Sequence, residues 1–188
     1  MRLLAWLGGR RTVLAVLTAI TALHMGLVVV GNVTDYGTNL AFVQHVLAMD
    51  TTFRAPHTMW RAVTDHSAVT ATYVAIILWE ALTAVVLLAG FVAWVRVLAV
   101  GRGFDTARHL SSCGWLMLVM LFGGGFIVIG GEWFQMWQSS TWNGLQPALQ
   151  NFLIGSVGLV VAHLGQAGSA PGEHLPPQDR SRTLVQTD

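Results

Sequence analysis

Residues 70–95 read TATYVAIILWEALTAVVLLAGFVAWV, and this stretch decides the fold. Glu80 is its one charged residue, and the stretch exceeds the about 20 residues that a helix needs to cross a hydrocarbon core of about 30 Å. Three further apolar runs occupy residues 13–31, 110–131 and 148–165. We therefore predict an all-α integral membrane protein, a four-transmembrane-helix bundle.

The composition is typical of a chain embedded in lipid. The sequence is 54% hydrophobic and 10% charged, whereas soluble domains carry about 25% charged residues. Because four crossings and their loops fill residues 1–165, we expect one transmembrane domain and no separate soluble catalytic domain. Residues 166–188 combine Gly, Ser, Pro and charge, which predicts a disordered cytoplasmic tail. The net charge of +1 gives no reason to expect nucleic-acid binding.

The arginine residues predict how the chain is threaded. All ten basic residues are Arg, and only Arg54 and Arg61 lie in the two loops that four crossings place on one side. The others share the opposite side: Arg2, Arg10, Arg11, Arg96, Arg102, Arg108, Arg180 and Arg182. The positive-inside rule assigns the richer side to the cytoplasm. We therefore expect a multi-pass protein of the cytoplasmic (inner) membrane with both termini in the cytoplasm.

The first outer loop, about residues 32–69, has helical periodicity. Its apolar residues Tyr36, Leu40, Val43 and Leu47 recur at i, i+4, i+7 and i+11, which describes one face of a helix. A short amphipathic helix beside a membrane lies in the interface. We predict such an interfacial helix in this loop.

Glu80 and His24 are the two ionisable residues of interest inside the predicted spans. Glu80 lies about 15 Å along its helix from the outer end, at 1.5 Å per residue, and therefore near the midplane of the bilayer. A charged residue there costs about 2.5–3.5 kcal/mol on insertion scales and is a functional candidate by default. His24 lies in the outer half of the first helix. We predict a buried contact between His24 and Glu80.

Other polar residues extend this pair into a seam. Tyr73 and Thr83 share the helix face of Glu80, and Thr21 lies one turn from His24. Two interpretations remain open. The seam is a proton path or ligand contact, or it is an interhelical polar clamp of about 0.6 kcal/mol.

The third span is rich in glycine: Gly123, Gly124, Gly125, Gly130 and Gly131. Small residues let helix backbones approach closely in lipid, where apolar burial does not drive association. We predict that these glycines mark close helix packing, and a break or hinge in the helix is the alternative.

The outer loops carry aromatic and metal-ligating residue types. Aromatic residues beside polar ones are typical of protein interfaces, and we predict partner contacts at Tyr36, Phe42, His45, Trp133, Phe134, Trp137 and Trp142. The histidines and carboxylates His45, Asp50, His57, His66 and Glu132 suit Zn or Cu. Their spacing matches no recognised ligand motif, so they are weak candidates, and no cofactor is predicted.

Two segments resemble a known family. They are residues 32–51, NVTDYGTNLAFVQHVLAMDT, and residues 132–144, EWFQMWQSSTWNG. The chain is similar over residues 13–165 to the bacterial predicted small integral membrane proteins catalogued as a domain of unknown function (number 2165). The resemblance implies a four-helix membrane protein and implies no activity and no site residues.

Three functions are compatible with these features. The first is a non-catalytic accessory or structural subunit of a larger integral-membrane complex, respiratory or oxidative, which docks through the outer aromatic loops and the glycine-rich third helix. Its partners would be other membrane chains and lipids, in an oligomer or hetero-complex. The alternative is a small proton-coupled transporter that uses Glu80 and His24. A metal-binding membrane enzyme is the third, although we identify no catalytic residue and do not expect an enzyme.

Overall fold

A computed structural model describes residues 1–164, and within this range the regular structure is entirely helical. In chain order the elements are α1 (Arg2–Leu7), α2 (Arg10–Thr34), α3 (Tyr36–Ala48), the 3-10 helix η1 (Met59–Arg61), α4 (His66–Val100), α5 (Phe104–Val119), the π-helix η2 (Met120–Trp133), the 3-10 helix η3 (Met136–Gln138) and α6 (Leu145–His163). Four helical segments are long and apolar enough to cross a membrane: α2, α4, α5 with η2, and α6. The predicted four-helix membrane fold is confirmed, whereas the predicted tail at 166–188 lies outside the described residues.

The length of α4 follows from its two ends. The Asp65 carboxylate accepts a hydrogen bond from the Ala68 N–H at 2.8 Å and caps the first turn. At the other end Gly101 adopts a left-handed conformation (φ +79°), which glycine tolerates and which stops the helix. The 35 residues between these ends span about 52 Å. The helix is therefore longer than the predicted span 70–95 and extends beyond the hydrocarbon core.

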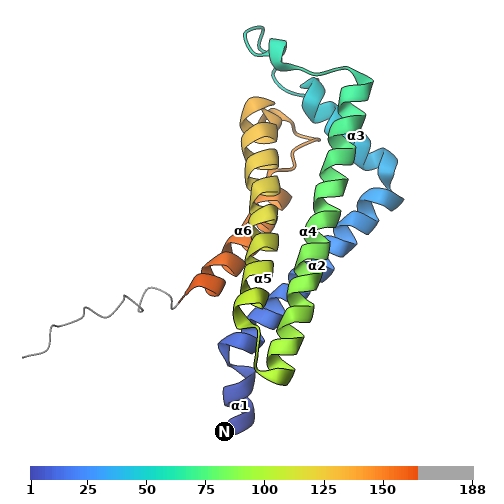
Figure 1. The fold of residues 1–188 in the computed structure, drawn as a ribbon. Helices are drawn as coiled ribbons and strands as arrows, with labels where there is room; N and C mark the ends of the chain where they lie inside the picture. Colours follow the sequence, from blue (N-terminus) through green and yellow to red (C-terminus); the bar gives the residue numbers. More distant parts are fainter. Residues whose placement is uncertain (165–188) are drawn as a thin grey trace, which may run out of the picture.

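The bundle is built from neighbours in sequence (Figure 1). Helix α2 packs on α4, α4 on α5, and α5 on α6, while fewer contacts join α2 to α6. Met1 and the last turn of α6 lie at the same end of the bundle, as four crossings require. Helix α3 packs on α4 at the opposite end, which we call the α3 end. The membrane side on which each end lies stays a prediction, and so does the interfacial position of α3.

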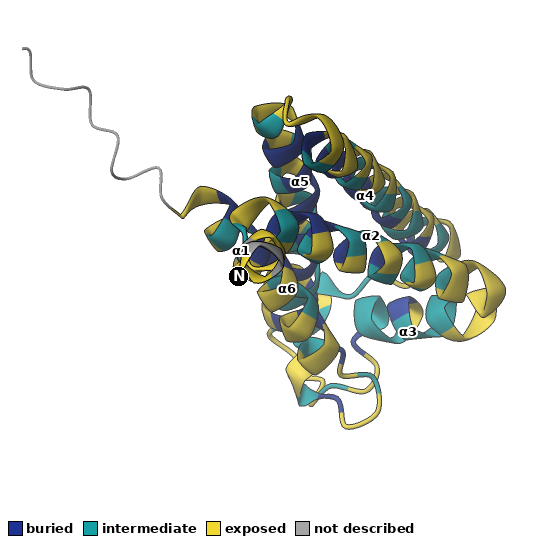
Figure 2. Cartoon of the chain, turned by 90° about the horizontal axis from the view of Figure 1, so that it is seen from below, coloured by how far each residue is buried: buried dark blue, intermediate teal, exposed yellow. Residues whose placement is uncertain are grey.

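Small residues allow tight packing in the half of the bundle away from α3. A Cβ added at Gly90 would lie 2.9 Å from Ser111 Oγ, and one added at Gly158 would collide with the indole of Trp115. Trp115 is fully buried, and Figure 2 shows the buried residues facing inward between the helices. Helices in lipid associate through such close contacts. These glycines were not identified from the sequence.

The glycines of the third span have mixed surroundings within the π-helix η2. Gly123 and Gly131 lie against Phe152 and Leu145, whose side chains would be 2.9 Å from an added Cβ. The remaining three glycines have more room: Gly130 at 3.5 Å from Met136 Cε, Gly125 beside Leu121 of its own helix, and Gly124 with nothing within 4 Å. The packing prediction is therefore wrong for Gly124, and Gly125 contacts no second helix at that distance.

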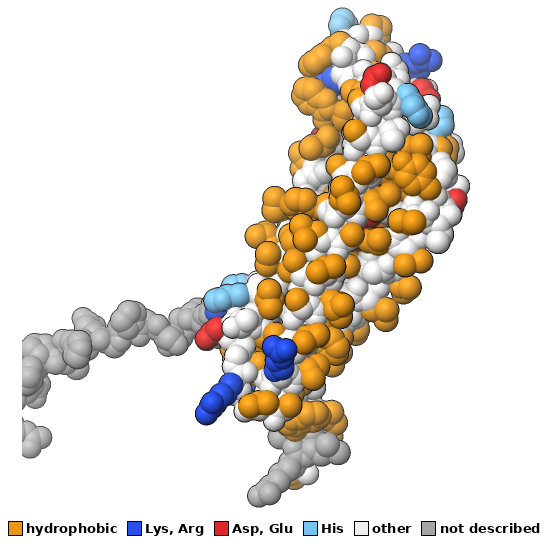
Figure 3. Space-filling view, turned by 45° about the vertical axis from the view of Figure 1, so that its right-hand side comes forward, with side chains coloured by type: hydrophobic (Ala, Val, Ile, Leu, Met, Phe, Trp, Pro, Cys, Tyr) orange, Lys and Arg blue, Asp and Glu red, His pale blue; other side chains and the backbone are white. Residues whose placement is uncertain are grey.

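The outer surface of the bundle is apolar along its length. Large side chains more than half exposed include Ile20, Leu23, Leu27, Leu78, Val85 and Leu88. Figure 3 shows hydrophobic side chains over the middle of the molecule, with arginine at both ends. Such a surface suits contact with lipid chains, because exposing it to water would be unfavourable.

Candidate functional site: a cavity at the α3 end

A cavity of about 440 Å³ lies between the helices at the α3 end. Its volume falls within the range of about 300–1,000 Å³ that is usual for small-molecule sites. The lining comes from five helices and one loop: Val28 and Asn32 of α2, Thr38, Asn39, Phe42 and Val43 of α3, Tyr73, Ile76 and Glu80 of α4, Phe122 and Phe126 of η2, residues 141–144, and Pro147, Ala148 and Asn151 of α6. Thr38, Thr141 and Asn143 are exposed and form its rim.

Glu80 lies at the inner part of this lining and is 2% exposed. Asn32 donates its side-chain amide to Glu80 Oε2 at 2.6 Å, which joins α2 to α4. Tyr73, about two turns from Glu80 on α4, donates its hydroxyl to the backbone carbonyl of Asn32 at 2.8 Å. Asn32 is thus held from both sides. The three residues form a polar group on one wall of the cavity.

The predicted His24–Glu80 contact is wrong. His24 Nε2 lies 2.7 Å from Asn151 Oδ1 and so joins α2 to α6 rather than to α4. Asn32 and His24 are eight residues apart, which places them about 80° apart around the helix at 3.6 residues per turn. They therefore face different neighbours. Asn151 also lines the cavity, so His24 lies behind one wall of the cavity and Glu80 lies on another.

The lower members of the predicted seam have separate partners. Thr83 donates to the backbone carbonyl of Trp79 at 2.7 Å. Thr21 donates to the carbonyl of Leu17 and accepts the indole N–H of Trp115 at 3.2 Å. Neither hydroxyl bonds to Glu80 or His24, so the polar seam does not continue past Glu80 into the other half of the bundle.

Four aromatic rings form a row along another side of the cavity. Trp142 lies 6.3 Å from Phe42, measured between ring centroids, and Phe42 lies 6.5 Å from Phe126 in a near-parallel stack. Phe126 lies 5.2 Å from Phe122. All four rings line the cavity, and the row runs from the loop at the rim to Phe122 near the start of η2.

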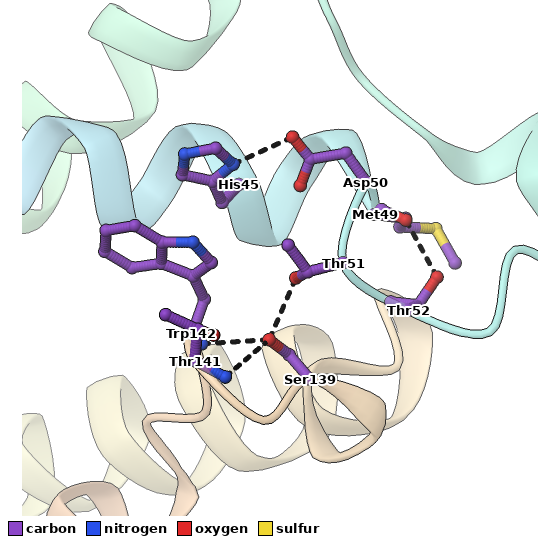
Figure 4. A network of polar contacts seen from close by, with 8 residues as sticks. All are labelled: His45, Met49, Asp50, Thr51, Thr52, Ser139, Thr141 and Trp142. Carbon is purple, nitrogen blue, oxygen red and sulfur yellow. Dashed lines mark hydrogen bonds and ion pairs between the residues drawn. The ribbon is translucent and has the colours of Figure 1, made fainter.

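Contacts of α3 and the turn that follows it with the loop before α6 hold the rim in place (Figure 4). The Ser139 hydroxyl oxygen accepts hydrogen bonds from Thr51 Oγ1 at 2.8 Å and from the backbone N–H of Trp142 at 2.9 Å. The imidazole of His45 stacks on Trp142 at 4.6 Å, and its Nδ1 lies 2.8 Å from the Asp50 carboxylate. Trp142 is therefore positioned by both its backbone and its ring.

The weak metal candidates are not brought together. His45 and Asp50 pair with each other, while His57, His66 and Glu132 are exposed on other segments. Across residues 1–164 no three His, Cys, Asp or Glu side chains are close enough to hold a metal ion.

The residues predicted to contact partners fall into three environments. Phe134 is buried (7% exposed) and cannot reach a partner, which corrects that prediction. Phe42, His45 and Trp142 pack against one another around the cavity. The exposed members are Trp133, Trp137 and, to a smaller degree, Tyr36, whose ring lies 4.9 Å from that of Tyr73.

Four helical segments long and apolar enough to cross a membrane define a multi-pass integral membrane protein of the α-helical class. The family model described as "Predicted small integral membrane protein (DUF2165)" matches residues 10–165. The chain belongs to this family. No curated protein and no solved structure matches the chain.

Two cavity residues were missed from the sequence although each left a signal. Asn32 was assigned to the loop because the apolar run ends near residue 31, but α2 continues to Thr34 and turns Asn32 toward α4. Asn151 lies inside the predicted fourth span, where an amide is rare enough to mark a buried hydrogen bond.

Proposed function

We propose that this protein is a small proton-coupled solute carrier that receives its ligand in the cavity at the α3 end. The observation that supports this proposal is the buried carboxyl group of Glu80 at the inner part of a cavity with an exposed polar rim. A carboxyl group costs free energy at this depth, and a structural role alone would be served by a neutral amide. A group that can gain or lose a proton at a ligand site links solute binding to protons.

The surroundings of Glu80 suit reversible protonation. Asn32 donates to the carboxylate, and the other titratable side chain near it on α4 is Tyr73, whose hydroxyl donates to the Asn32 carbonyl. His24 lies across the cavity wall on Asn151. Below Glu80 the bundle is closed by contacts such as Gly114 on Leu87, where an added Cβ would lie 2.5 Å from Leu87 Cγ. A cavity open at the α3 end and closed below Glu80 is the arrangement expected of a carrier that faces one side of the membrane.

Proteoliposomes that enclose a pH-sensitive dye test this function. A panel of small amines, amino acids, carboxylates and sugars is added, and proton movement is compared with that in protein-free vesicles. We expect at least one class of solute to cause proton movement through the protein. Glu80→Gln should abolish this dye signal, although the glutamine side chain still offers Asn32 a hydrogen-bond acceptor. Glu132→Gln, at an exposed site away from the cavity, is the matched control. A protein-dependent signal that survives in Glu80→Gln, or no signal with any class, overturns the proposal.

The accessory-subunit function remains a second candidate because of two exposed aromatic pairs at the α3 end. Trp60 and Trp133 meet edge to face at 5.6 Å, with the Arg61 guanidinium 4.7 Å from the Trp133 ring. Phe53 and Trp137 form a similar pair. Exposed aromatic residues serve partner contacts, but they also anchor proteins at the membrane interface. Native gel analysis of mild detergent extracts decides this point. A stoichiometric partner that is lost in Trp133→Ala supports the subunit function, and a lone chain opposes it.

A further inference from the structure

We propose that the cavity selects a small organic cation, with Glu80 as its counter-ion and the row of aromatic rings as its wall. This proposal rests on the proposed function, because it names the class of ligand for the same cavity.

Charge is the first reason. Among the cavity-lining residues, Glu80 is the one carboxylic acid, and none of the lining residues is Asp, Arg, Lys or His. The Tyr73 phenol, which also lines the cavity, is neutral at pH 7. The other polar lining groups are neutral amides and hydroxyls, such as those of Asn39, Thr38 and Asn143. An anionic ligand would meet a carboxylate with no opposing positive charge. A cation would gain an ion pair at a depth where its attraction is little screened by water.

The aromatic row is the second reason. Trp142, Phe42, Phe126 and Phe122 follow one another at centroid distances of 5.2–6.5 Å from the rim inward. The faces of aromatic rings carry partial negative charge and attract cations within about 6 Å, most strongly when water is excluded. The rings also give apolar contact to the alkyl groups of a substituted ammonium ion. The row therefore offers a cation favourable contacts between the exposed rim and Glu80.

The same walls disfavour an inorganic metal ion. A hard cation needs about six oxygen ligands at short distance, and the aromatic rings supply none. The Asn32 amide points its N–H group at Glu80, so it does not add an oxygen ligand beside the carboxylate. Its hydrogen bond also takes up one of the two carboxylate oxygens. The cavity volume of about 440 Å³ also greatly exceeds that of a bare ion. An organic ammonium ion fits both the walls and the size.

Thiol-reactive reagents of opposite charge test the selection directly. A cysteine is placed at Ile76, one turn from Glu80 in the cavity lining, in a Cys113→Ser background that removes the native thiol. The purified chain in lipid nanodiscs is exposed to trimethylammonioethyl methanethiosulfonate, which is itself an organic cation, and to sulfonatoethyl methanethiosulfonate, an anion. The measured quantity is the ratio of the two labelling rates. Asn39→Cys provides a second cavity position if Ile76→Cys folds poorly.

The comparison between carboxyl variants isolates the effect of Glu80. Because one reagent is attracted and the other repelled, replacing Glu80 with Gln should lower the cation-to-anion ratio about tenfold, which corresponds to about 1.4 kcal/mol. Intrinsic differences between the reagents cancel, since each cysteine is compared with itself. Glu132→Gln should leave the ratio unchanged, because Glu132 does not line the cavity.

The outcomes separate this inference from the function on which it rests. A ratio that changes by less than about twofold in Glu80→Gln overturns cation selection but leaves solute access intact. If neither reagent labels Ile76→Cys or Asn39→Cys faster than Leu78→Cys, whose side chain is exposed on the apolar outer surface of α4, the cavity is closed to solutes. That result overturns the proposed function and the cation site together.

Discussion

The hydrogen bond between Asn32 and Glu80 provides the sharpest test of how the cavity is organised. It joins α2 to α4 at 2.6 Å, and its acceptor is a carboxyl group that is 2% exposed. Replacing Asn32 with Ala removes the donor but retains the backbone carbonyl to which Tyr73 donates. The change therefore affects one interaction and leaves its neighbour in place.

The expected size follows from the geometry. Hydrogen bonds between transmembrane helices average about 0.6 kcal/mol and reach about 1.7 kcal/mol. Because this one is short and its acceptor is a buried carboxyl group, we expect a value near the upper end, about 1.5 kcal/mol, for Asn32→Ala. Glu80→Ala should destabilise the fold little or not at all, since it also removes an ionisable group whose placement at this depth costs about 2.5–3.5 kcal/mol.

A double-mutant cycle measures the interaction itself. The free energy of unfolding of the four proteins is obtained by titrating the detergent-solubilised chain with a denaturing detergent. In the Glu80→Ala background, Asn32→Ala should cost nearly nothing, so the coupling energy should equal about 1–1.7 kcal/mol. Asn39→Ala is the matched control, because the Asn39 amide donates only to the Asp35 carbonyl one turn away. If Asn32→Ala costs the same in both backgrounds within about 0.3 kcal/mol, the bond does not organise the site and the reasoning fails.

Three further predictions concern packing, buried polar groups and orientation. Gly158→Ala forces a methyl group into the Trp115 indole and should destabilise the fold by about 1–3 kcal/mol in the same detergent titration. Gly26→Ala is the control, because an added Cβ there has nothing within 4 Å, and it should be neutral or slightly stabilising. Ser111→Ala removes the hydroxyl that accepts the Trp94 indole N–H at 2.9 Å and the Thr18 hydroxyl at 3.0 Å; it should cost about 1–3 kcal/mol, and an unchanged unfolding midpoint would contradict it. In intact cells that carry Cys113→Ser, an impermeant thiol reagent should label Ala55→Cys at the α3 end, as the arginine distribution predicts. The reagent should reach Thr106→Cys only after permeabilisation, and the reverse labelling pattern would show the opposite orientation.

Part of the candidate site could be predicted from the sequence, because an ionisable residue inside a membrane span has a high free-energy cost. Glu80 can be identified from its own segment alone, because an ionisable group within an apolar run of this length is unfavourable however the neighbouring helices pack. Tyr73 followed from Glu80 by helical spacing alone, and both line the cavity. The partner of Glu80 was predicted incorrectly because the choice between His24 and Asn32 depends on how α2 is rotated about its axis. Each competing contact contributes about 1 kcal/mol or less in lipid, which is too little to leave a pattern in the sequence.

The aromatic residues of the cavity show the same limit of prediction from sequence. Trp142 and Phe42 were interpreted as partner contacts because aromatic residues in a loop are equally typical of an exposed interface. Ser139 turns Trp142 inward through its backbone N–H, and α3 carries Phe42 to the same place. No local property of either segment specifies this meeting.

By itself the sequence determined the solvent of this protein and the number of its crossings, because hydrophobicity and the length of an apolar run are properties of one segment at a time. It also predicts the orientation, because arginine content is counted loop by loop. Only the tertiary structure decided that Asn32 rather than His24 pairs with Glu80, that Gly158 rather than Gly124 closes a helix contact, and that four separated aromatic residues line one cavity. The physical reason is that these features depend on the rotation and tilt of helices against one another, which many small contacts set together.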